Sequence, residues 1–364
     1  MKARPTAPDV NPDSALAPAA PAVALDYPFG DRVPGPGEIV ALAPGIGWAR
    51  ISLPGSLGHI NVWLLDEDDG SVTIVDTGLR LKECKADWAA LFAGPLAGKR
   101  IARVIVTHFH PDHVGLAGWL CYKHDARLWM TRGEWLTVRM LAADARDAVP
   151  DEMTAFWRAA GWDGDQIATA SEGGWGRMAK IIAPLPLGYR RIQDGEVIRI
   201  GARDWRVVIG SGHSPEHACL VNDEDGIMIA GDQLLPKISS NVSLGITEPE
   251  ADPLGDWLAS LDRLDTLDPQ LLICPAHGEV FRGLNARVGA MRDEHLERLD
   301  ALADHIAHTP ARAVDVFPLL FRRKIGDSLR GLATGEALAH LRHLECIGRA
   351  TRQVKDDVWW FAAG

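Results

Sequence analysis

Short apolar runs, separated by turns rich in glycine, proline and aspartate, occupy the first part of the chain. Such runs between turn residues are typical of β-strands. The pattern predicts strands at residues 39–42, 49–53, 61–65 and 72–75. A helix with Trp88, Leu91 and Phe92 on one face follows, and then a buried strand at residues 104–106 that ends in a histidine-rich loop.

Residues from about 131 to 187 differ from this pattern, because they are mostly helical in periodicity and carry several tryptophans. They predict a helical insertion. Strands resume after it, at residues 196–200, 205–209, 218–221 and 226–229. The order of strands, helices, strands and helices predicts a layered α/β architecture with mixed sheets.

The two ends of the chain have their own patterns. A long amphipathic helix is predicted over residues 284–307, and Pro310 ends it. Residues 311–364 then predict two helices and two short strands, which is the outline of a small winged-helix unit. Alanine and proline dominate the N-terminal end and predict a disordered tail. We therefore expect a tail at residues 1–28, a catalytic domain at 29–309 and a C-terminal domain at 310–364.

Composition narrows the class of protein. The formal net charge is −11, and a strongly acidic molecule repels nucleic acid and anionic membranes, which disfavours a nuclease. Five scattered cysteines without a CxxC pair predict reduced thiols rather than a thiolate metal site or a disulfide framework. No apolar run approaches a membrane span, and none follows Lys2 and Arg4 as it would in a secretory signal. We therefore expect a cytoplasmic protein.

The chemistry concentrates in the motif His108-x-His110-x-Asp112-His113, which directly follows the buried strand. Imidazole and carboxylate groups are ligands that zinc accepts readily, and a catalytic zinc site leaves one position open for water. Alternation along the loop places His108 and His110 on one side. The turn at Pro111 lets the side chains of Asp112 and His113 face a second position nearby. The alternative is a chance cluster in which Asp112 only caps a helix.

Three further candidate ligands each lie just past the end of a predicted strand, and they are His213, Asp232 and His277. Loops at strand ends converge on one edge of a sheet, so residues far apart in the chain meet there. Each of these residues alone is a weak signal. Together with the histidine motif they predict one metal site.

This order of HxHxDH, histidine, aspartate and histidine resembles the metallo-β-lactamase superfamily over roughly residues 39–281. The resemblance implies an αββα sandwich, with the helical insertion and the winged-helix-like unit added to it. It implies two metal ions that share one carboxylate, with His108, His110 and His213 on the first ion, Asp112, His113 and His277 on the second, and Asp232 between them. Asp76 matches the structural aspartate that orders the metal loop in this superfamily.

The bridging carboxylate narrows the branch of the superfamily. The best-known β-lactamases use a cysteine at the second metal or lack the bridging carboxylate, whereas Asp232 resembles glyoxalase II-like thioesterases, lactonases and phosphodiesterases. Flavodiiron proteins place glutamate where His110 stands, which disfavours an oxygen-reducing role. We expect two divalent ions, with zinc preferred and iron or manganese as alternatives, because nitrogen and oxygen sites accept all three.

Two dications that share a water lower its pKa toward neutrality, so we expect a metal-bound hydroxide to attack an acyl carbon. Asp112 is expected to be catalytic, as a ligand that orients the nucleophile and receives its proton. His217 is either a second catalytic group or a packing histidine. Lys237 and Asn241 follow Asp232 closely and either bind a substrate carboxylate or carbonyl, or form a solvated turn.

The expected function is hydrolysis of a small-molecule carboxylic ester, thioester or lactone. The C-terminal pattern resembles the tail of a branch that contains both thioester hydrolases and a single-strand-specific endoribonuclease. RNA phosphodiester hydrolysis is therefore an alternative, as is β-lactam hydrolysis, and a non-enzymatic scaffold is disfavoured by the complete ligand set. Residues 311–364 carry only nine lysines and arginines against six acidic residues. No aromatic residues interleave with these cations, as they would on a surface that stacks RNA bases. Packing, or formation of a homodimer, is the plainer role of this segment.

Overall fold

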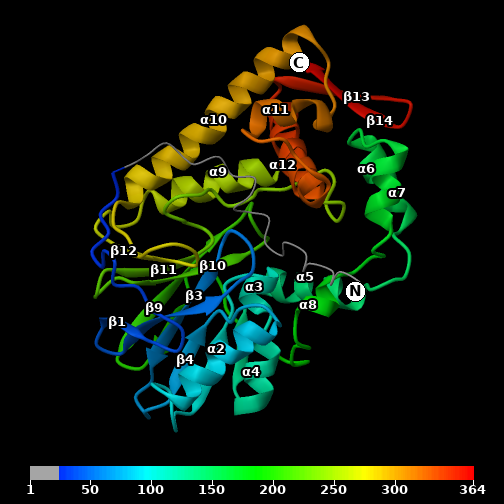
Figure 1. Cartoon of the computed structure of the whole chain (residues 1–364). Coiled ribbons are helices and arrows are strands. Elements are labelled where there is room, and N and C mark those ends of the chain that lie inside the picture. Colours follow the sequence, from blue (N-terminus) through cyan, green and yellow to red (C-terminus); the bar gives the residue numbers. More distant parts are fainter. Residues whose placement is uncertain (1–23) are drawn as a thin grey trace.

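The computed structural model describes residues 24–364, so nearly all of the predicted N-terminal tail lies outside the described residues. Two β-sheets pack face to face, and helices cover their outer sides (Figure 1). One apolar cluster lies between the sheets and contains Trp48, Trp63 and Trp205. Two further clusters fill the space between each sheet and its helices. The predicted αββα sandwich is confirmed.

The first sheet contains seven strands that follow one another in sequence order. They are β1 (Val40–Ala43), β2 (Ile46–Ser52), β3 (His59–Asp66), β4 (Val72–Val75), β5 (Ile101–Ile105), β6 (Arg127–Met130) and β7 (Arg190–Arg191). The strands β1 to β4 pair antiparallel, and the pairs from β4 to β7 are parallel. Parallel neighbours bring the loops at their carboxyl ends to one edge, which is where the histidine motif begins.

The second sheet has the order β12-β11-β10-β9-β8. Its strands are β8 (Val197–Ile200), β9 (Arg203–Gly210), β10 (His217–Asn222), β11 (Ile227–Gly231) and β12 (Leu272–Pro275). β11 and β12 pair parallel, and the others pair antiparallel. The strands predicted in both halves of the chain are present, but the pattern missed the two-residue strand β7 and also β6, which begins two residues after the exposed turn at Asp125.

Helices cover the first sheet and form the insertion. The helices beside the first sheet are α2 (Lys82–Ala93), α3 (Pro111–Val114) and α4 (Ala117–His124). The insertion between β6 and β7 contains α5 (Arg132–Ala143), α6 (Asp151–Ala159), α7 (Gly164–Ser171) and α8 (Met178–Ile181). The predicted helical character of this segment is confirmed.

The remaining elements pack on the second sheet (Figure 1). They are α9 (Pro253–Leu264), α10 (Leu284–His308), the short 3-10 helix η1 (Ala313–Val316), α11 (Phe317–Leu320), α12 (Asp327–Cys346) and the hairpin of β13 (Ala350–Lys355) and β14 (Val358–Ala363). Leu338 of α12 and Phe361 of β14 belong to the same apolar cluster as Trp257 of α9. The C-terminal segment therefore shares one core with the second sheet. None of the helices within residues 24–364 has an apolar stretch of the length that a membrane span requires.

Candidate metal centre

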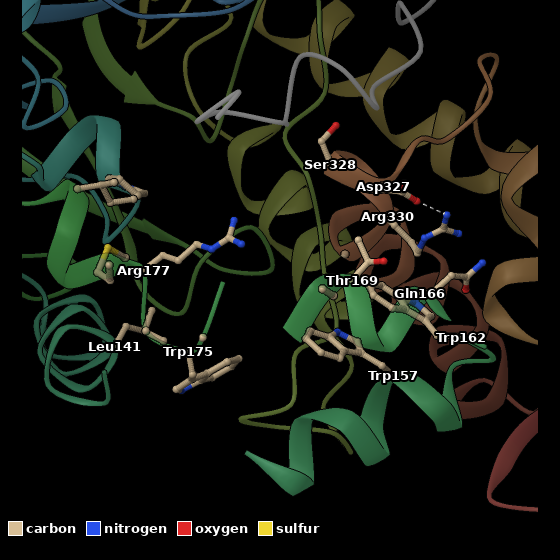
Figure 2. A pocket seen from close by; sticks show the side chains of 17 residues that line it. Leu141, Trp157, Trp162, Gln166, Thr169, Trp175, Arg177, Asp327, Ser328 and Arg330 are labelled. Carbon is tan, nitrogen blue, oxygen red and sulfur yellow. Dashed lines mark hydrogen bonds and ion pairs between the residues drawn. The ribbon is translucent and has the colours of Figure 1, made fainter. Parts of the chain in front are cut away.

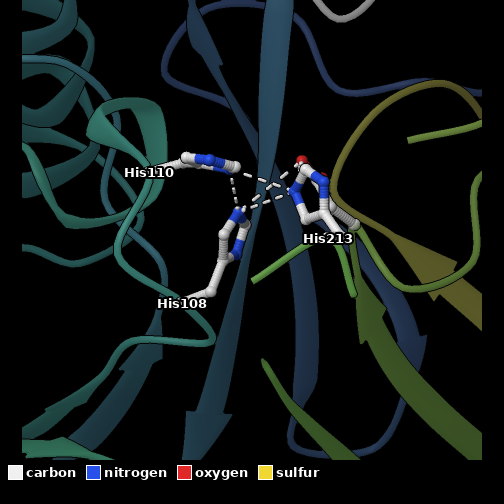
Figure 3. A group of neighbouring side chains, drawn as sticks. His108, His110 and His213 are labelled. Atoms are coloured by element: carbon white, nitrogen blue, oxygen red, sulfur yellow. Dashed lines mark hydrogen bonds and ion pairs between the residues drawn. The ribbon is translucent and has the colours of Figure 1, made fainter. Parts of the chain in front are cut away.

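The seven candidate ligands meet at one edge of the sandwich, in two groups. The atoms that each residue offers lie within 4.8 Å of one another in the group His108, His110, His213 and Asp232, and likewise in the group Asp112, His113 and His277. The loops after β5, β9, β11 and β12 carry them, as the sequence predicts. Figure 3 shows the imidazoles of His108, His110 and His213 turned toward one another.

The spacing of the first group suits a small tetrahedral ion. The distance from Nδ1 of His110 to Nε2 of His108 is 2.9 Å, and to Nε2 of His213 it is 3.0 Å. The two Nε2 atoms lie 3.3 Å apart. Ligand atoms around tetrahedral zinc, with Zn–N bonds of about 2.0–2.1 Å, are separated by roughly 3.4 Å. Three imidazole nitrogens at these separations therefore fit one zinc-sized ion.

Asp232 lies between the two groups. Its Oδ2 is 3.5 Å from Nε2 of His213 and 3.4 Å from Nε2 of His113, and its Oδ1 is 3.5 Å from Nε2 of His277. Asp112 faces the second group, with its Oδ2 3.3 Å from Nε2 of His277. One carboxylate thus faces both groups, which is the position expected of a bridging ligand.

Several polar atoms at the centre are buried without an aligned partner. Nε2 of His113, Nε2 of His277 and Oδ1 of Asp232 make no hydrogen bond to any residue in the described part of the chain. Carboxylate oxygens do lie 3.3–3.7 Å from the two imidazole nitrogens. Buried polar groups normally have partners, because leaving one unsatisfied costs about 1–3 kcal/mol. A divalent ion on each group would satisfy all three atoms, so the residues present fit two such ions.

Protonation in the first group also suits metal binding. Burial lowers the pKa of His110 to about 3, and the neighbouring His213 adds to the shift. Burial alone would raise the pKa of Asp232, but the imidazoles around it, above all His113, hold that pKa well below its usual value. Neutral imidazoles and an ionised carboxylate are the forms that bind metals.

Hydrogen bonds behind the ligands fix which ring nitrogen faces the centre. Nδ1 of His213 donates to the backbone oxygen of Asn241 at 2.7 Å, and Nδ1 of His277 donates to that of His59 at 2.9 Å. When Nδ1 carries the proton, the lone pair of Nε2 is left for a metal. The tautomer of both histidines is therefore set by the backbone.

Asp76 orders the histidine loop, as expected from its match to the structural aspartate of the superfamily that the sequence resembles. Its backbone has φ of 61°, and its buried carboxylate accepts hydrogen bonds from the backbone N–H of Thr107 at 2.9 Å and from Nδ1 of His113 at 2.8 Å. A left-handed conformation is costly for a non-glycine residue, although aspartate tolerates it better than most. The carboxylate therefore holds the start of the loop and one candidate ligand together.

His217 lies behind Asp232 rather than at an open position. It is fully buried, and its Nε2 accepts a hydrogen bond from the backbone N–H of Asp232 at 3.0 Å. Burial holds its pKa well below the ordinary value, in keeping with a neutral acceptor. Gly231 makes room for it, because a Cβ there would lie 2.5 Å from Nε2 of His217 and the backbone φ is +51°. This placement connects His217 to the candidate bridge.

The side chains of the two residues predicted to bind substrate make their polar contacts with residues other than the seven candidate ligands. Lys237 is exposed and forms an ion pair with Glu279 at 2.9 Å. The side chain of Asn241 is buried and donates to Glu336 of α12 at 2.8 Å, while its backbone oxygen accepts from His213. Asn241 is thus placed to position His213, and direct substrate contact by either residue stays a prediction.

One buried glutamate beside the centre was not predicted from the sequence. Glu134 of α5 accepts hydrogen bonds from the backbone N–H of Phe109 at 2.8 Å, from Oγ of Ser214 at 2.7 Å and from the backbone N–H of Glu216 at 2.7 Å. It therefore joins the histidine motif to the His213 loop. Burial raises its pKa to about 7 despite these bonds. The available signal was an acidic residue one helical turn from Val138, on the buried face of α5.

A second unpredicted network joins the centre to the C-terminal segment. Glu336 accepts from Asn241 and pairs with Arg298 of α10 at 3.2 Å, and Arg298 pairs with Glu294 at 2.8 Å. Glu294 in turn accepts from Oγ of Ser239 at 2.8 Å. All of these side chains are nearly buried. The network ties α10 and α12 to the loop that follows Asp232.

Comparison with known proteins identifies the class. The sequence matches the metallo-beta-lactamase superfamily over residues 55–277, and the C-terminal domain of metallo-beta-lactamase-like proteins over residues 299–364. The chain therefore belongs to the metallo-β-lactamase superfamily, and the resemblance seen in its motifs is confirmed.

Three individual proteins add detail. A crystal structure of a beta-lactamase domain protein from Burkholderia ambifaria is similar at 40% identity and a TM-score of 0.85, covering 93% of this chain and 98% of that one. The probable metallo-hydrolase YqjP of Bacillus subtilis is 25% identical over 320 residues, which is 86% of this chain and 96% of the relative. The human acyl-coenzyme A thioesterase MBLAC2 is 27% identical over 201 residues, which is 53% of this chain and 64% of the relative. Together with the fold, these relatives mark the chain as a metal-dependent hydrolase.

Proposed function

We propose that this protein hydrolyses a small-molecule thioester at a centre of two divalent metal ions, preferably zinc, and that carboxylic esters and lactones are substrates of the same chemistry. The observation that carries the proposal is the carboxylate of Asp232, which faces both groups of candidate ligands within 3.4–3.5 Å. Two ions held on such a bridge would ionise a water near neutral pH and stabilise a developing oxyanion. Ester and thioester hydrolysis need both the ionised water and the stabilised oxyanion.

The side chains of the protein take distinct parts in this proposal. His108, His110 and His213 would hold the first ion, while His113 and His277 would join Asp112 on the second. Asp112 also orients the attacking water and receives its proton. His217 and Asp76 position Asp232 and His113 through the hydrogen bonds described above.

Relatives and charge support the choice of substrate. The human relative is named as an acyl-coenzyme A thioesterase, and the Asp232 bridge resembles thioesterases, lactonases and phosphodiesterases rather than the best-known β-lactamases. RNA hydrolysis is the second candidate, and the net charge of −11 opposes it, because binding to the phosphate backbone depends on cationic contacts. We therefore place small molecules before RNA.

A substrate panel tests the proposal. Zinc-loaded protein is assayed with acetyl-, butyryl- and benzoyl-coenzyme A, a p-nitrophenyl ester, a γ-lactone, a β-lactam and single-stranded RNA. We expect thioester hydrolysis that is lost on chelation, restored by zinc and absent in His110→Ala, with His308→Ala, an exposed histidine at the end of α10, as the matched control. Cleavage of RNA or the β-lactam alone, or activity that survives in His110→Ala, would refute the proposal.

A further inference from the structure

A cavity with a volume of about 510 Å³ opens beside the candidate metal centre. Its lining comes from the insertion, from the N-terminal turn of α12 and from Pro111, which stands between His110 and Asp112 in the histidine motif. A volume of this size is typical of small-molecule pockets. A ligand in the cavity would therefore contact Pro111, whose neighbours in the chain, His110 and Asp112, are candidate ligands.

One wall of the cavity is aromatic and electrically balanced (Figure 2). The rings of Trp157 and Trp162 stack with centroids 5.0 Å apart and an interplanar angle of 5°. Arg330 lies over the Trp162 ring, at 5.8 Å from its centroid, and pairs with Asp327 at 2.7 Å. This wall therefore offers apolar surface and no unpaired charge.

Arg177 approaches from the opposite wall, and Figure 2 shows its guanidinium reaching into the space between the walls. No aspartate or glutamate among residues 24–364 forms an ion pair with it, and its side chain makes no hydrogen bond there. Because Asp327 neutralises Arg330, the charged lining residues leave a net charge of +1 at Arg177. A planar guanidinium binds carboxylate and phosphate groups through paired hydrogen bonds.

We propose that this cavity is the substrate subsite and that Arg177 selects substrates whose apolar group carries an anion, a carboxylate or a phosphate, away from the scissile bond. The aromatic wall binds the apolar segment, and Arg177 binds the anion. That a ligand bound in this cavity is the substrate rests on the proposed function, because only Pro111 connects the cavity to the histidine motif. The binding of an apolar anion by the tryptophans and Arg177 does not depend on the proposed function.

Calorimetric titration with three probes of one shape tests this subsite. The probes are 4-phenylbutyrate, 4-phenylbutyl phosphate and the neutral 4-phenylbutan-1-ol, each added to the zinc-loaded full-length protein. We expect an anionic probe to bind about tenfold or more tightly than the alcohol, as a charged hydrogen-bonded pair would give. The preference for carboxylate or for phosphate then identifies the anion. Equal affinity of all three probes would overturn the proposal.

Two variants locate the binding. Arg177→Gln should remove the preference for the anion, while Arg177→Lys keeps part of it and Lys180→Gln, which removes a charge on α8 outside the cavity, leaves it intact. Gly331→Phe should block all three probes. Gly331 lines the cavity and a Cβ placed there meets open space within 4 Å, so the added ring has room to fill the space that the probes would occupy. Unchanged affinities in both Arg177→Gln and Gly331→Phe would contradict the subsite.

The same titration after chelation separates this inference from the proposed function. Arg177 and the tryptophans are not candidate ligands, so the preference for the anion should persist without metal. If chelation abolished the preference and Arg177→Gln did not, the anion would be bound by the metal centre, and the role of Arg177 would be refuted. A protein that binds the anion through Arg177 but hydrolyses no thioester would refute the proposed function alone.

Discussion

The candidate metal centre and the cavity beside it are built in different ways. The centre takes its side chains from loops that directly follow β-strands of the two sheets, and hydrogen bonds to Asp76, His59 and Asn241 hold three of the imidazoles. The cavity takes its lining from short helices of the insertion and from α12, with only Pro111 from the histidine motif. The sheet edge thus positions the reactive groups, whereas the added helices shape the space for substrate.

The two regions are joined by α12. Its first turn lines the cavity at Asp327, and Glu336 further along binds Asn241, whose backbone holds His213. α12 therefore connects the cavity to the candidate metal centre through Asn241. Substitutions in and around each region show how far the two regions act separately.

The largest effect is expected from Asp232→Ala. Removing the shared carboxylate leaves two dications without screening between them, so the second ion should bind more weakly than the first and turnover should fall by more than about a hundredfold. Metal content by mass spectrometry and thioester turnover measure the two effects. Asp223→Ala, in an exposed turn, is the control. Wild-type metal content and rate in Asp232→Ala would show that the residue is no bridge.

A smaller loss is expected from Glu134→Ala, which removes the acceptor shared by the two ligand-bearing loops. Partners behind metal ligands typically contribute about 10–100-fold to metal affinity. We expect a loss in this range in zinc affinity, measured by competition with a chelator. Glu152→Ala, an exposed glutamate in the same insertion, should change nothing. An unchanged zinc affinity would mean that the loops are held without Glu134.

Glu336→Gln should act on stability more than on chemistry. It removes one partner of a buried ion pair with Arg298, which typically costs about 3 kcal/mol, although Glu294 remains on the same guanidinium. Chemical denaturation should report a lower free energy of unfolding, and zinc affinity should fall modestly through Asn241. Glu297→Gln, an exposed residue of α10, serves as the control. Full stability in Glu336→Gln would remove the coupling through α12.

The smallest effect is expected from reversing the three exposed cations Arg322, Arg323 and Lys324, which precede α12. None of them forms an ion pair within the described residues, so the fold should not change. Turnover of acetyl-coenzyme A should stay within about twofold, since loss of exposed charges typically changes interactions by less than about 1 kcal/mol. Salt-sensitive RNA cleavage by the wild type that disappears in this variant would favour the RNA alternative instead.

The difference between the two regions also explains what the sequence could predict. The candidate ligands were found because histidines and aspartates rarely follow buried strands in such number, and the structure brings all seven together. Their action as ligands stays a prediction. Glu134 escaped because a single acidic residue in an amphipathic helix looks like any solvated position until the loops that it binds are in place.

The cavity could not be predicted for a related physical reason. The sequence showed several tryptophans in the helical insertion, but Arg177 and Arg330 come from segments that only the folded chain places around one cavity. The strands were more accessible, since alternation and turn residues act locally. Even there the first hairpin differs in its ends, with β2 starting at Ile46 directly after Gly45, whose φ of +75° makes a tighter turn than the pattern suggested.

Metal titration of the chelated protein tests the central claim most directly. Zinc is added stepwise to a known concentration of chains, and bound zinc and acetyl-coenzyme A hydrolysis are measured at each step. The shared Asp232 predicts saturation at two ions per chain and full turnover only as the second ion binds. Saturation at one ion, or full turnover before any zinc is added, would contradict a dinuclear centre.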